Sequence, residues 1–303
     1  MSKKHIHWNK IVNRGLIYFF AGIVVIAFLA PFSWLVIASL QKEADLLSVP
    51  PHIIPKNPTL ITYQKLLRGE RLEEEMKSGG VRTYSVPREA KLFPTSLSNS
   101  FIVSASTTIL CLIVGSLSAY SMARLNFKGG KVLLLIILAT RMVPGLTLII
   151  PFFLLGKSLG LLDSKIALII VYSTFTLPYT IWILKAFFET IPPDLEDAAR
   201  VDGCTRFQAF WKIILPVAQS GLVGAAIFIF MLAWNEFFFA LILTNTASSF
   251  TVPVISGMFA TELDIDYSLM ITSGVLAVIP PVLFTFIFQR FIITGLAAGS
   301  VKG

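Results

Sequence analysis

The chain has 303 residues, of which 55% are hydrophobic and 14% are charged, and its mean hydropathy is +0.78. This composition excludes an ordinary soluble domain, in which charged residues make up about a quarter of the chain. The formal net charge of +8 does not indicate nucleic-acid binding, because membrane proteins collect Lys and Arg in their cytoplasmic loops. We therefore expect a membrane protein with no nucleic-acid partner.

Six apolar runs are long enough to cross a bilayer, which takes about 20 residues. In lipid the backbone must satisfy its own hydrogen bonds, so these runs are expected to form helices. None of them alternates apolar and polar residues as the strands of a membrane barrel do. The sequence predicts an all-α, polytopic membrane bundle of six transmembrane helices at 16–40, 97–123, 132–156, 166–184, 217–243 and 267–289.

The charges of the short segments set the expected orientation. A basic tail precedes the first run, and this run is longer than the roughly 7–15 apolar residues of a signal peptide. We interpret it as an uncleaved span. The connection 124–131 contains basic residues and no acid, whereas the loop 244–266 contains acids and no base. Placing the basic segments inside makes both termini cytoplasmic.

The orientation also predicts how the chain is organised. Within the long loop after the first span, segment 68–80 is either a short surface helix or a solvated spacer. The expected parts are a cytoplasmic tail (1–15), the first transmembrane helix (16–40), an extracytoplasmic loop (41–96), a five-helix core (97–293) that includes a cytoplasmic loop (190–216), and a cytoplasmic tail (294–303).

The cytoplasmic loop between the fourth and fifth runs contains the sequence EDAARVDGCTRFQAFWKIILP at 196–216. Pro192 and Pro193 suit the first turn of a helix, and the helix dipole favours the acidic residues that follow them. Gly203 is a suitable C-terminal cap. The pattern predicts a short helix that ends in a tight turn.

A second short helix is expected after this turn. Thr205 and Gln208 have the spacing of a capping box, and Pro216 is expected to end the helix. Four residues share one apolar face by their i, i+3, i+4, i+7 spacing. They are Phe207, Phe210, Trp211 and Ile214. This face fits a helix lying on the bilayer, whereas the acidic, small-residue first helix fits close contact with a protein partner.

This loop resembles the EAA loop in permease subunits of ATP-binding-cassette importers. The family pattern is Glu-Ala-Ala, three residues, Gly, nine residues, Ile, one residue and Leu-Pro. The chain departs from it at Asp197, which replaces the glutamate, and at Cys204, where alanine often follows the glycine. The matching positions are Asp197, Ala198, Ala199, Gly203, Ile213, Leu215 and Pro216.

The resemblance covers most of the chain and is greatest to the six-span second permease of maltose-type carbohydrate importers. It implies an all-α, MetI-like fold of the type I importer class. The stretch 68–92 is longer than usual for the family. The segments that carry the resemblance are NPTLITYQKLL (57–67), SLSNSFIVS (96–104), SAYSMARLNFKGG (118–130), RMVPG (141–145), AWNEFFFALILT (233–244) and GLAAGSVKG (295–303).

In such importers the EAA loop docks into cytoplasmic ATPase subunits. The resemblance implies a non-enzymatic permease of a bacterial inner membrane that transports an oligosaccharide, or a related polyol or sugar phosphate. The implied partners are a second permease in a heterodimer, two ATPase subunits that bind ATP and magnesium, and an extracytoplasmic solute-binding protein. The residues to which it assigns coupling are Asp194, Glu196, Asp197, Ala198, Ala199, Asp202, Gly203, Phe207, Ile213, Leu215 and Pro216.

Two ionisable residues, Arg141 and Glu236, lie inside the predicted spans. A central Arg costs about 2.5–3.5 kcal/mol on insertion scales, so these residues should face protein or water. Together with Asn235, they are candidates for hydrogen bonding to a substrate in the translocation pathway. A structural ion pair, or a position near the end of a span, would explain them equally well.

Other function classes find less support in the sequence. An ion-coupled secondary transporter would show internal repeats and more intramembrane charges. A membrane anchor would not need the charged loop. No catalytic or metal-binding pattern is present, and Pro151 stands where the first glycine of an ATP-binding P-loop ending at 156–158 is required. We therefore expect no cofactor and no metal in this chain.

Overall fold

The computed structural model describes residues 3–50, 52–68, 88–125, 127–260 and 265–299. Helices make up most of these described residues, which confirms the all-α prediction. The β pairing in the described part is an isolated bridge between Ala260 and Ile265. The proposed surface helix in segment 68–80 lies outside the described residues, apart from Arg68.

Four helices are continuous and long enough to span a membrane. They are α1 (Lys3–Ser39), α5 (Phe93–Arg124), α8 (Lys165–Thr190) and α15 (Tyr267–Gly299). Two further candidate spans are pairs of helices bent at a short break, by 86° and 77°. Counting each bent pair as one span gives up to six, which is the predicted number.

The first bent pair corrects the prediction of one helix over 132–156. It consists of α6 (Gly130–Ala139) with η2 (Thr140–Met142), then η3 (Gly145–Leu148) with α7 (Ile149–Ser158). The break falls at Pro144, where Val143 has the extended backbone that a residue before proline prefers. Pro151 lies in the first turn of α7, and Pro178 lies inside the continuous α8. Of these three prolines, only Pro144 lies at a break.

The fifth predicted span, 217–243, is also interrupted. Its first part, α12 (Gln219–Trp234), is bent against the preceding helical segment. That segment consists of α10 (Arg206–Ala209), the π-helical turn η4 (Phe210–Ile214) and α11 (Leu215–Val217). Helix α12 ends at Trp234, and the chain becomes helical again in α13 (Phe238–Leu243). The apolar run therefore indicated membrane depth without showing where the helix breaks.

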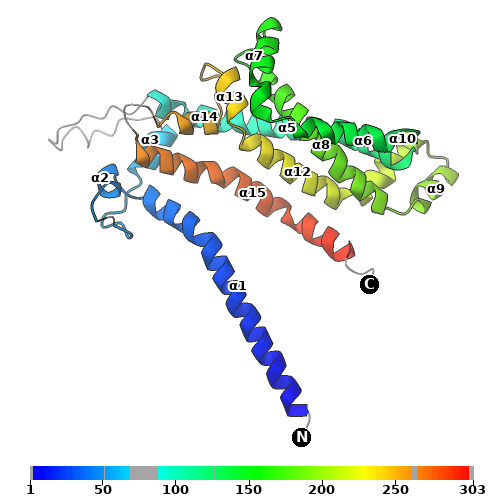
Figure 1. Cartoon of the computed structure of the whole chain (residues 1–303), viewed down its shortest axis with the longest axis horizontal. Helices are drawn as coiled ribbons and strands as arrows, with labels where there is room; N and C mark the ends of the chain where they lie inside the picture. Colours follow the sequence, from blue (N-terminus) through cyan, green and yellow to red (C-terminus); the bar gives the residue numbers. More distant parts are fainter. Residues whose placement is uncertain (1–2, 51, 69–87, 126, 261–264, 300–303) are drawn as a thin grey trace.

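The central packing unit consists of α5 alongside α8, with α12 packed against both and α15 against α12 (Figure 1). Small residues permit this close approach. A Cβ added at Gly115 would lie 2.5 Å from the Thr180 methyl group, and one added at Gly221 would lie 2.4 Å from the Phe187 ring. The α5–α8 and α8–α12 contacts therefore depend on these two glycines.

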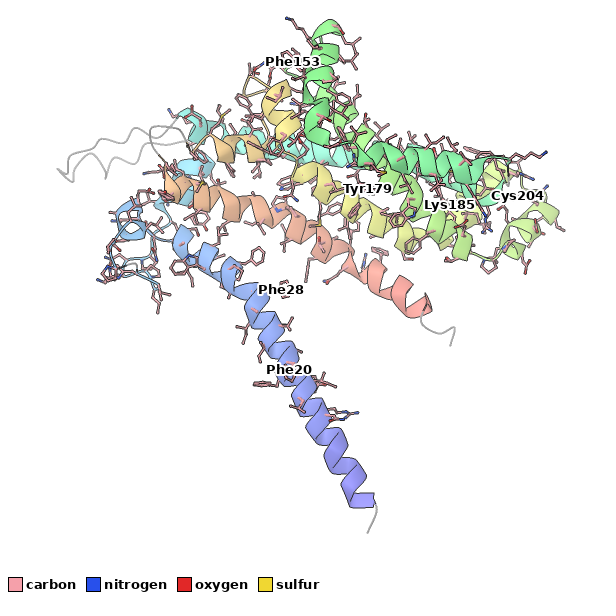
Figure 2. All side chains as sticks on the ribbon, viewed as in Figure 1. Phe20, Phe28, Phe153, Tyr179, Lys185 and Cys204 are labelled. Carbon is pink, nitrogen blue, oxygen red and sulfur yellow. The ribbon has the colours of Figure 1, made fainter. Side chains whose placement is uncertain are left out.

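The first helix, α1, leaves the bundle. It meets α15 near its C-terminal end, and its N-terminal part extends away from the other helices (Figure 1). Phe20 and Phe28 are 60% and 71% exposed on this free part (Figure 2). An apolar helix of this length needs lipid or another protein around it.

The loops gather at opposite ends of the bundle, one marked by α14 (Val252–Gly257) and the other by α9 (Asp194–Val201) (Figure 1). At the α14 end, α2 (Glu43–Leu46) contributes Glu43, which accepts hydrogen bonds from Tyr267 N and Ser268 N at the start of α15. The chain also runs here through α3 (Ile61–Arg68) and η1 (Arg88–Leu92). The described parts of loops 41–96 and 244–266, both predicted to be extracytoplasmic, lie at this same end, and their orientation in the membrane stays a prediction.

Asp163 holds two loops together at the α14 end. Its carboxylate accepts hydrogen bonds from Asn245 N (2.8 Å), from Thr246 N and Oγ1 (3.0 and 2.6 Å) and from Ser249 Oγ. Burial raises the pKa of Asp163, but these donors outweigh it and lower the pKa from 3.8 to about 2. The loop after α7 is thereby fixed to the loop after α13.

We expect Gly115→Ala to destabilise the bundle by about 1–3 kcal/mol, because the new methyl group would overlap Thr180 in a closely packed contact. Gly224→Ala is the matched control, since an added Cβ at Gly224 would meet nothing within 4 Å. Thermal unfolding of both variants in mild detergent measures the difference. Equal midpoints would contradict the close-packing interpretation.

We expect Asp163→Asn to lower stability at neutral pH by about 1 kcal/mol, a small value because the carboxylate is partly solvated. The folded pKa lies below the unfolded one, so the stabilisation is present above about pH 4 and is lost as the pH falls toward about 2. The gap between wild-type and variant unfolding midpoints should narrow over that range. A gap independent of pH would show that the charge does not stabilise this loop.

Candidate functional site

The predicted helix and tight turn of the charged loop are present at the α9 end. Helix α9 begins after Pro193, and its first turn contains three acidic residues. Gly203 has φ +89°, a conformation that favours glycine. Gly203 N donates to Arg200 O and Cys204 N donates to Ala199 O, which together form a Schellman motif. This motif fixes the direction in which the chain leaves α9.

The second helix begins as predicted. Gln208 N donates to Thr205 Oγ1 at 3.2 Å, and Thr205 N donates to Gln208 Oε1 at 2.8 Å, which completes the capping box. Its predicted end is wrong, because the helical path continues through Pro216 to Val217 before the bend into α12. Proline is tolerated there, since Pro216 lies in the first turn of α11.

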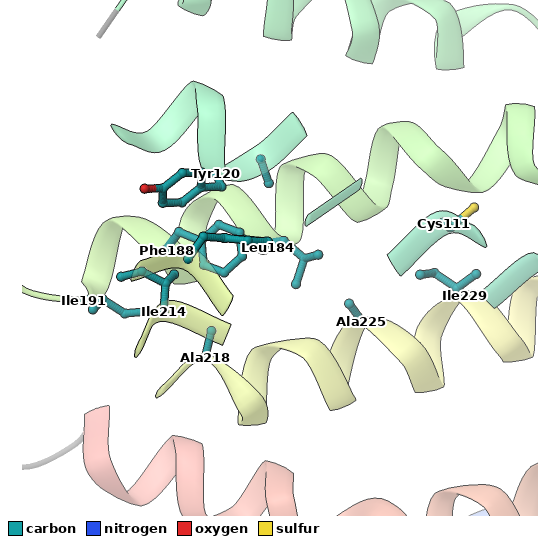
Figure 3. Packing of buried hydrophobic residues seen from close by; sticks show 11 residues of the cluster. Cys111, Tyr120, Leu184, Phe188, Ile191, Ile214, Ala218, Ala225 and Ile229 are labelled. Atoms are coloured by element: carbon teal, nitrogen blue, oxygen red, sulfur yellow. The ribbon is translucent and has the colours of Figure 1, made fainter. Parts of the chain in front are cut away.

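The predicted single apolar face of this second helix is divided in the structure. Phe210 and Ile214 are 1% and 0% exposed in the core, whereas Phe207 and Trp211 are 62% and 52% exposed. Figure 3 shows Ile214 beside Phe188 and Leu184 of α8. Packing in the bundle therefore explains Phe210 and Ile214, whereas Phe207 and Trp211 are exposed to lipid or to a partner.

The residues assigned to coupling fall into two sets. Most of them are exposed: Asp194, Asp197, Ala198, Asp202, Gly203 and Phe207 on α9, α10 and the turn between them, and Pro216 on α11. Glu196 and Ala199 are buried, and Ile213 and Leu215 are partly buried. An added Cβ at Gly203 would meet no atom within 4 Å, so the turn is open to a partner. The exposed set forms a surface, and the buried set joins it to the bundle.

Glu196 has partners that were not identified as functional from the sequence. Tyr120 Oη donates to Glu196 Oε1 at 2.6 Å, and Arg124 Nε lies 3.7 Å from Glu196 Oε2. Both partners belong to the last turns of α5, four residues apart. That i, i+4 spacing is the sequence signal that could have placed them on one helix face.

Arg141 and Glu236 line one pocket of about 290 Å³ between the two broken spans and α8. The Arg141 guanidinium lies 5.1 Å from the centre of the Phe175 ring and 5.0 Å from that of Tyr179. Such cation–π contacts stabilise a charge away from water. The structure brings the two predicted residues together, but it forms no ion pair between them.

Glu236 has a structural role at this pocket. Its carboxylate accepts hydrogen bonds from Phe239 N (2.9 Å) and Ala240 N (3.1 Å), which are free N–H groups at the start of α13. The other candidate, Asn235, lies outside this pocket. It is exposed, donates to Met231 O at 2.8 Å, and lines a larger pocket of about 550 Å³ between α12, α14 and α15. The three candidates therefore border two cavities.

Comparison with known proteins identifies the family. Residues 111–297 match the family described as "Binding-protein-dependent transport system inner membrane component". The chain belongs to this family. It is therefore a membrane permease component and not an enzyme.

Two relatives align with this permease along nearly their full length. The trehalose transport system permease protein SugB of Mycobacterium tuberculosis (strain CDC 1551 / Oshkosh) is 35% identical over 277 residues, which are 91% of this chain and 93% of SugB. The sulfoquinovosyl glycerol transport system permease protein SmoH of Agrobacterium fabrum (strain C58 / ATCC 33970) is 34% identical over 291 residues, 96% of this chain and 95% of SmoH.

A solved structure supports the fold. The crystal structure of a bacterial ABC transporter involved in the import of the acidic polysaccharide alginate contains a chain that matches with a TM-score of 0.70 at 22% identity. The match covers 94% of this permease and 96% of that chain. The predicted type I importer fold is thereby confirmed.

We expect Gly203→Asp to reduce ATP-driven uptake while membrane insertion persists, because a side chain strains the left-handed turn and enters the open space beside it. Gly160→Asp is the matched control, since Gly160 also has a positive φ (+66°) and open surroundings but lies in the loop after α7, away from the α9 end. Both variants are compared with the wild type by their uptake per inserted protein. A decrease of at least about tenfold in Gly203→Asp alone is expected, and equal uptake in both variants would contradict it.

Proposed function

We propose that this chain is one of two permease subunits of an ATP-driven carbohydrate importer in the bacterial cytoplasmic membrane. Its termini face the cytoplasm, and so does the α9 end. The observation that carries the proposal is the exposed helix–turn–helix at that end. It combines acidic residues in the first turn of α9, an open glycine turn and two exposed aromatic side chains, Phe207 and Trp211.

This surface suits a soluble motor subunit better than lipid. Asp197 and Asp202 are exposed beside Val201, which is 87% exposed. A surface that mixes carboxylates and apolar side chains at the end of a membrane bundle fits a groove on a protein. Inserting the carboxylates into the apolar part of the bilayer would be energetically unfavourable. We assign ATP and magnesium to two such motor subunits.

The free α1 helix supports a second permease in the complex. Its apolar sides are exposed over the membrane-spanning window, of which 0% is buried inside this chain. A second permease would cover part of this surface and would close the pathway beside the two pockets. We propose a heterodimer, as the resemblance to maltose-type importers implies.

The substrate class rests on the relatives and on the chemistry of the Arg141–Glu236 pocket. The names of SugB and SmoH assign trehalose and sulfoquinovosyl glycerol to those proteins. A donor, an acceptor and several aromatic rings around one pocket suit a hydroxylated ring compound. We propose a carbohydrate delivered by an extracytoplasmic solute-binding protein.

The proposal is tested by purifying the tagged chain from its native membrane in mild detergent and identifying its partners by mass spectrometry. An ATP-binding subunit and a second permease should co-purify with the wild type and with Gly160→Asp. The ATP-binding subunit should be lost, or reduced at least about tenfold, in an Asp197→Ala/Gly203→Asp variant that still inserts, whereas the second permease should remain. A chain purified alone that performs ion-coupled uptake in liposomes would overturn the proposal in favour of a secondary transporter.

We expect Glu236→Ala to reduce uptake but to leave co-purification of the ATPase intact, because Glu236 lies at the pocket and not at the α9 end. The variant also leaves two N–H groups of α13 without their acceptor. Glu236→Gln retains one acceptor oxygen, so it should keep more uptake than the alanine variant. Uptake of radiolabelled trehalose and maltose measures transport by each variant, and a pull-down measures co-purification of the ATPase. Loss of assembly in both variants would make Glu236 purely structural.

A further inference from the structure

Three polar contacts connect the end of α5 to the segment that carries the exposed coupling surface. Tyr120 Oη donates to Glu196 Oε1 at 2.6 Å, and Arg124 Nη2 donates to Ile191 O at 2.6 Å. Arg124 Nε also forms an ion pair with Glu196 Oε2 at 3.7 Å. Ile191 follows α8 directly, and Glu196 lies in the first turn of α9. The contacts therefore hold both ends of the short link between α8 and α9.

These contacts are shielded from water. The side chains of Arg124 and Glu196 are 10% and 12% exposed, and Tyr120 is 7% exposed. The Tyr120 ring lies 4.8 Å from the Phe210 ring and 6.4 Å from the Phe188 ring, measured between centroids. Figure 3 shows the Tyr120 hydroxyl pointing away from the hydrocarbon of this cluster. A carboxylate in such a place is stable only while its partners remain in position.

The other main contacts of α9 are with segments close to it in the chain. Between α8 and α9 the chain consists of Ile191, Pro192 and Pro193, and the other end of α9 leads into the exposed Gly203 turn. Helix α9 also packs on α10 and η4, with Ala199 buried. The Tyr120–Glu196–Arg124 contacts add a direct connection to α5, which packs along α8 and α12 at the centre of the bundle.

We propose that Tyr120 and Arg124 are positioning residues that fasten α9 to α5, so that a displacement of α9 moves α5 and the helices packed on it. This inference rests on the proposed function, in which a motor subunit moves α9. Neither residue needs to contact the motor, because Glu196 faces the bundle while Asp197 beside it is exposed. Loss of the fastening should leave docking intact and reduce the transport obtained from each ATP.

The test uses the full importer in liposomes, with ATP hydrolysis and uptake measured in parallel. The uptake probe is the sugar that the wild type transports from a panel of trehalose, maltose and diacetylchitobiose. Tyr120→Phe removes the hydroxyl and keeps the ring, and Arg124→Gln removes the charge. Glu189→Gln is the matched control, because the Lys185–Glu189 pair lies within one helix, α8, and joins no separate elements.

We expect Tyr120→Phe and Arg124→Gln to retain the ATPase subunit and at least about half of the ATP hydrolysis, while uptake per ATP falls at least about fivefold. Glu189→Gln should remain within about twofold of wild type. The double variant Tyr120→Phe/Glu196→Ala should be no worse than Glu196→Ala alone, because Glu196→Ala already removes the acceptor of the Tyr120 hydrogen bond.

Two results would overturn the inference. Wild-type uptake per ATP in Tyr120→Phe and Arg124→Gln would show that the contacts do not transmit motion. Loss of the ATPase subunit, with hydrolysis and uptake falling together, would show that they only maintain the fold. Failure of the proposed function would look different, because the wild-type chain itself would then lack a co-purifying ATPase or ATP-dependent uptake.

Discussion

Backbone hydrogen bonding in lipid is the constraint on which this structure depends. Four spans satisfy it with unbroken helices, while two candidate spans are bent at short breaks. A break leaves N–H and C=O groups without helical partners, so side chains must supply them. Glu236 does this for the first N–H groups of α13, after the separate interruption that follows Trp234. Arg141 lies next to the break at Pro144, against Phe175 and Tyr179. The polar residues of the candidate pathway are therefore located where the helices are interrupted, which explains their presence at membrane depth.

Helix α8 connects this pocket with the α9 end. Phe175 and Thr176 line the pocket, and Phe188 on the same helix packs against Tyr120 and Phe210. At about 1.5 Å per residue, Thr176 and Phe188 are separated by roughly 18 Å along a continuous helix. Close packing of α5 on α8 at Gly115 prevents one helix from moving freely without the other. A displacement applied at α9 thus has a mechanically direct route to the pocket through both helices.

The sequence was sufficient to predict the fold class, the apolar runs and most of the local structure of the charged loop. Hydropathy shows that a run lies in the membrane, and Gly203, Thr205 and Gln208 are local signals with defined hydrogen-bond geometry. The breaks were harder to predict, because Pro144 and Pro178 have the same chemistry but only Pro144 lies at a break. The sequence also did not predict that Phe207 and Trp211 are exposed while Phe210 and Ile214 are buried. A helical spacing shows which residues share a face, whereas tertiary packing decides how much of that face is covered.

The contrast between Glu196 and Asp197 shows why a motif match does not assign roles to individual residues. Neighbouring residues on a helix point about 100° apart, so one of two adjacent carboxylates faces the bundle and the other faces solvent. Asp197 is consequently available to a partner, and Glu196 is occupied by Tyr120 and Arg124. The partners of Glu196 are about 75 residues earlier in the chain, a separation that no local pattern spans. An acidic pair at the start of a short helix can therefore divide its contacts, one carboxylate facing solvent and the other fixing the helix to the neighbouring span.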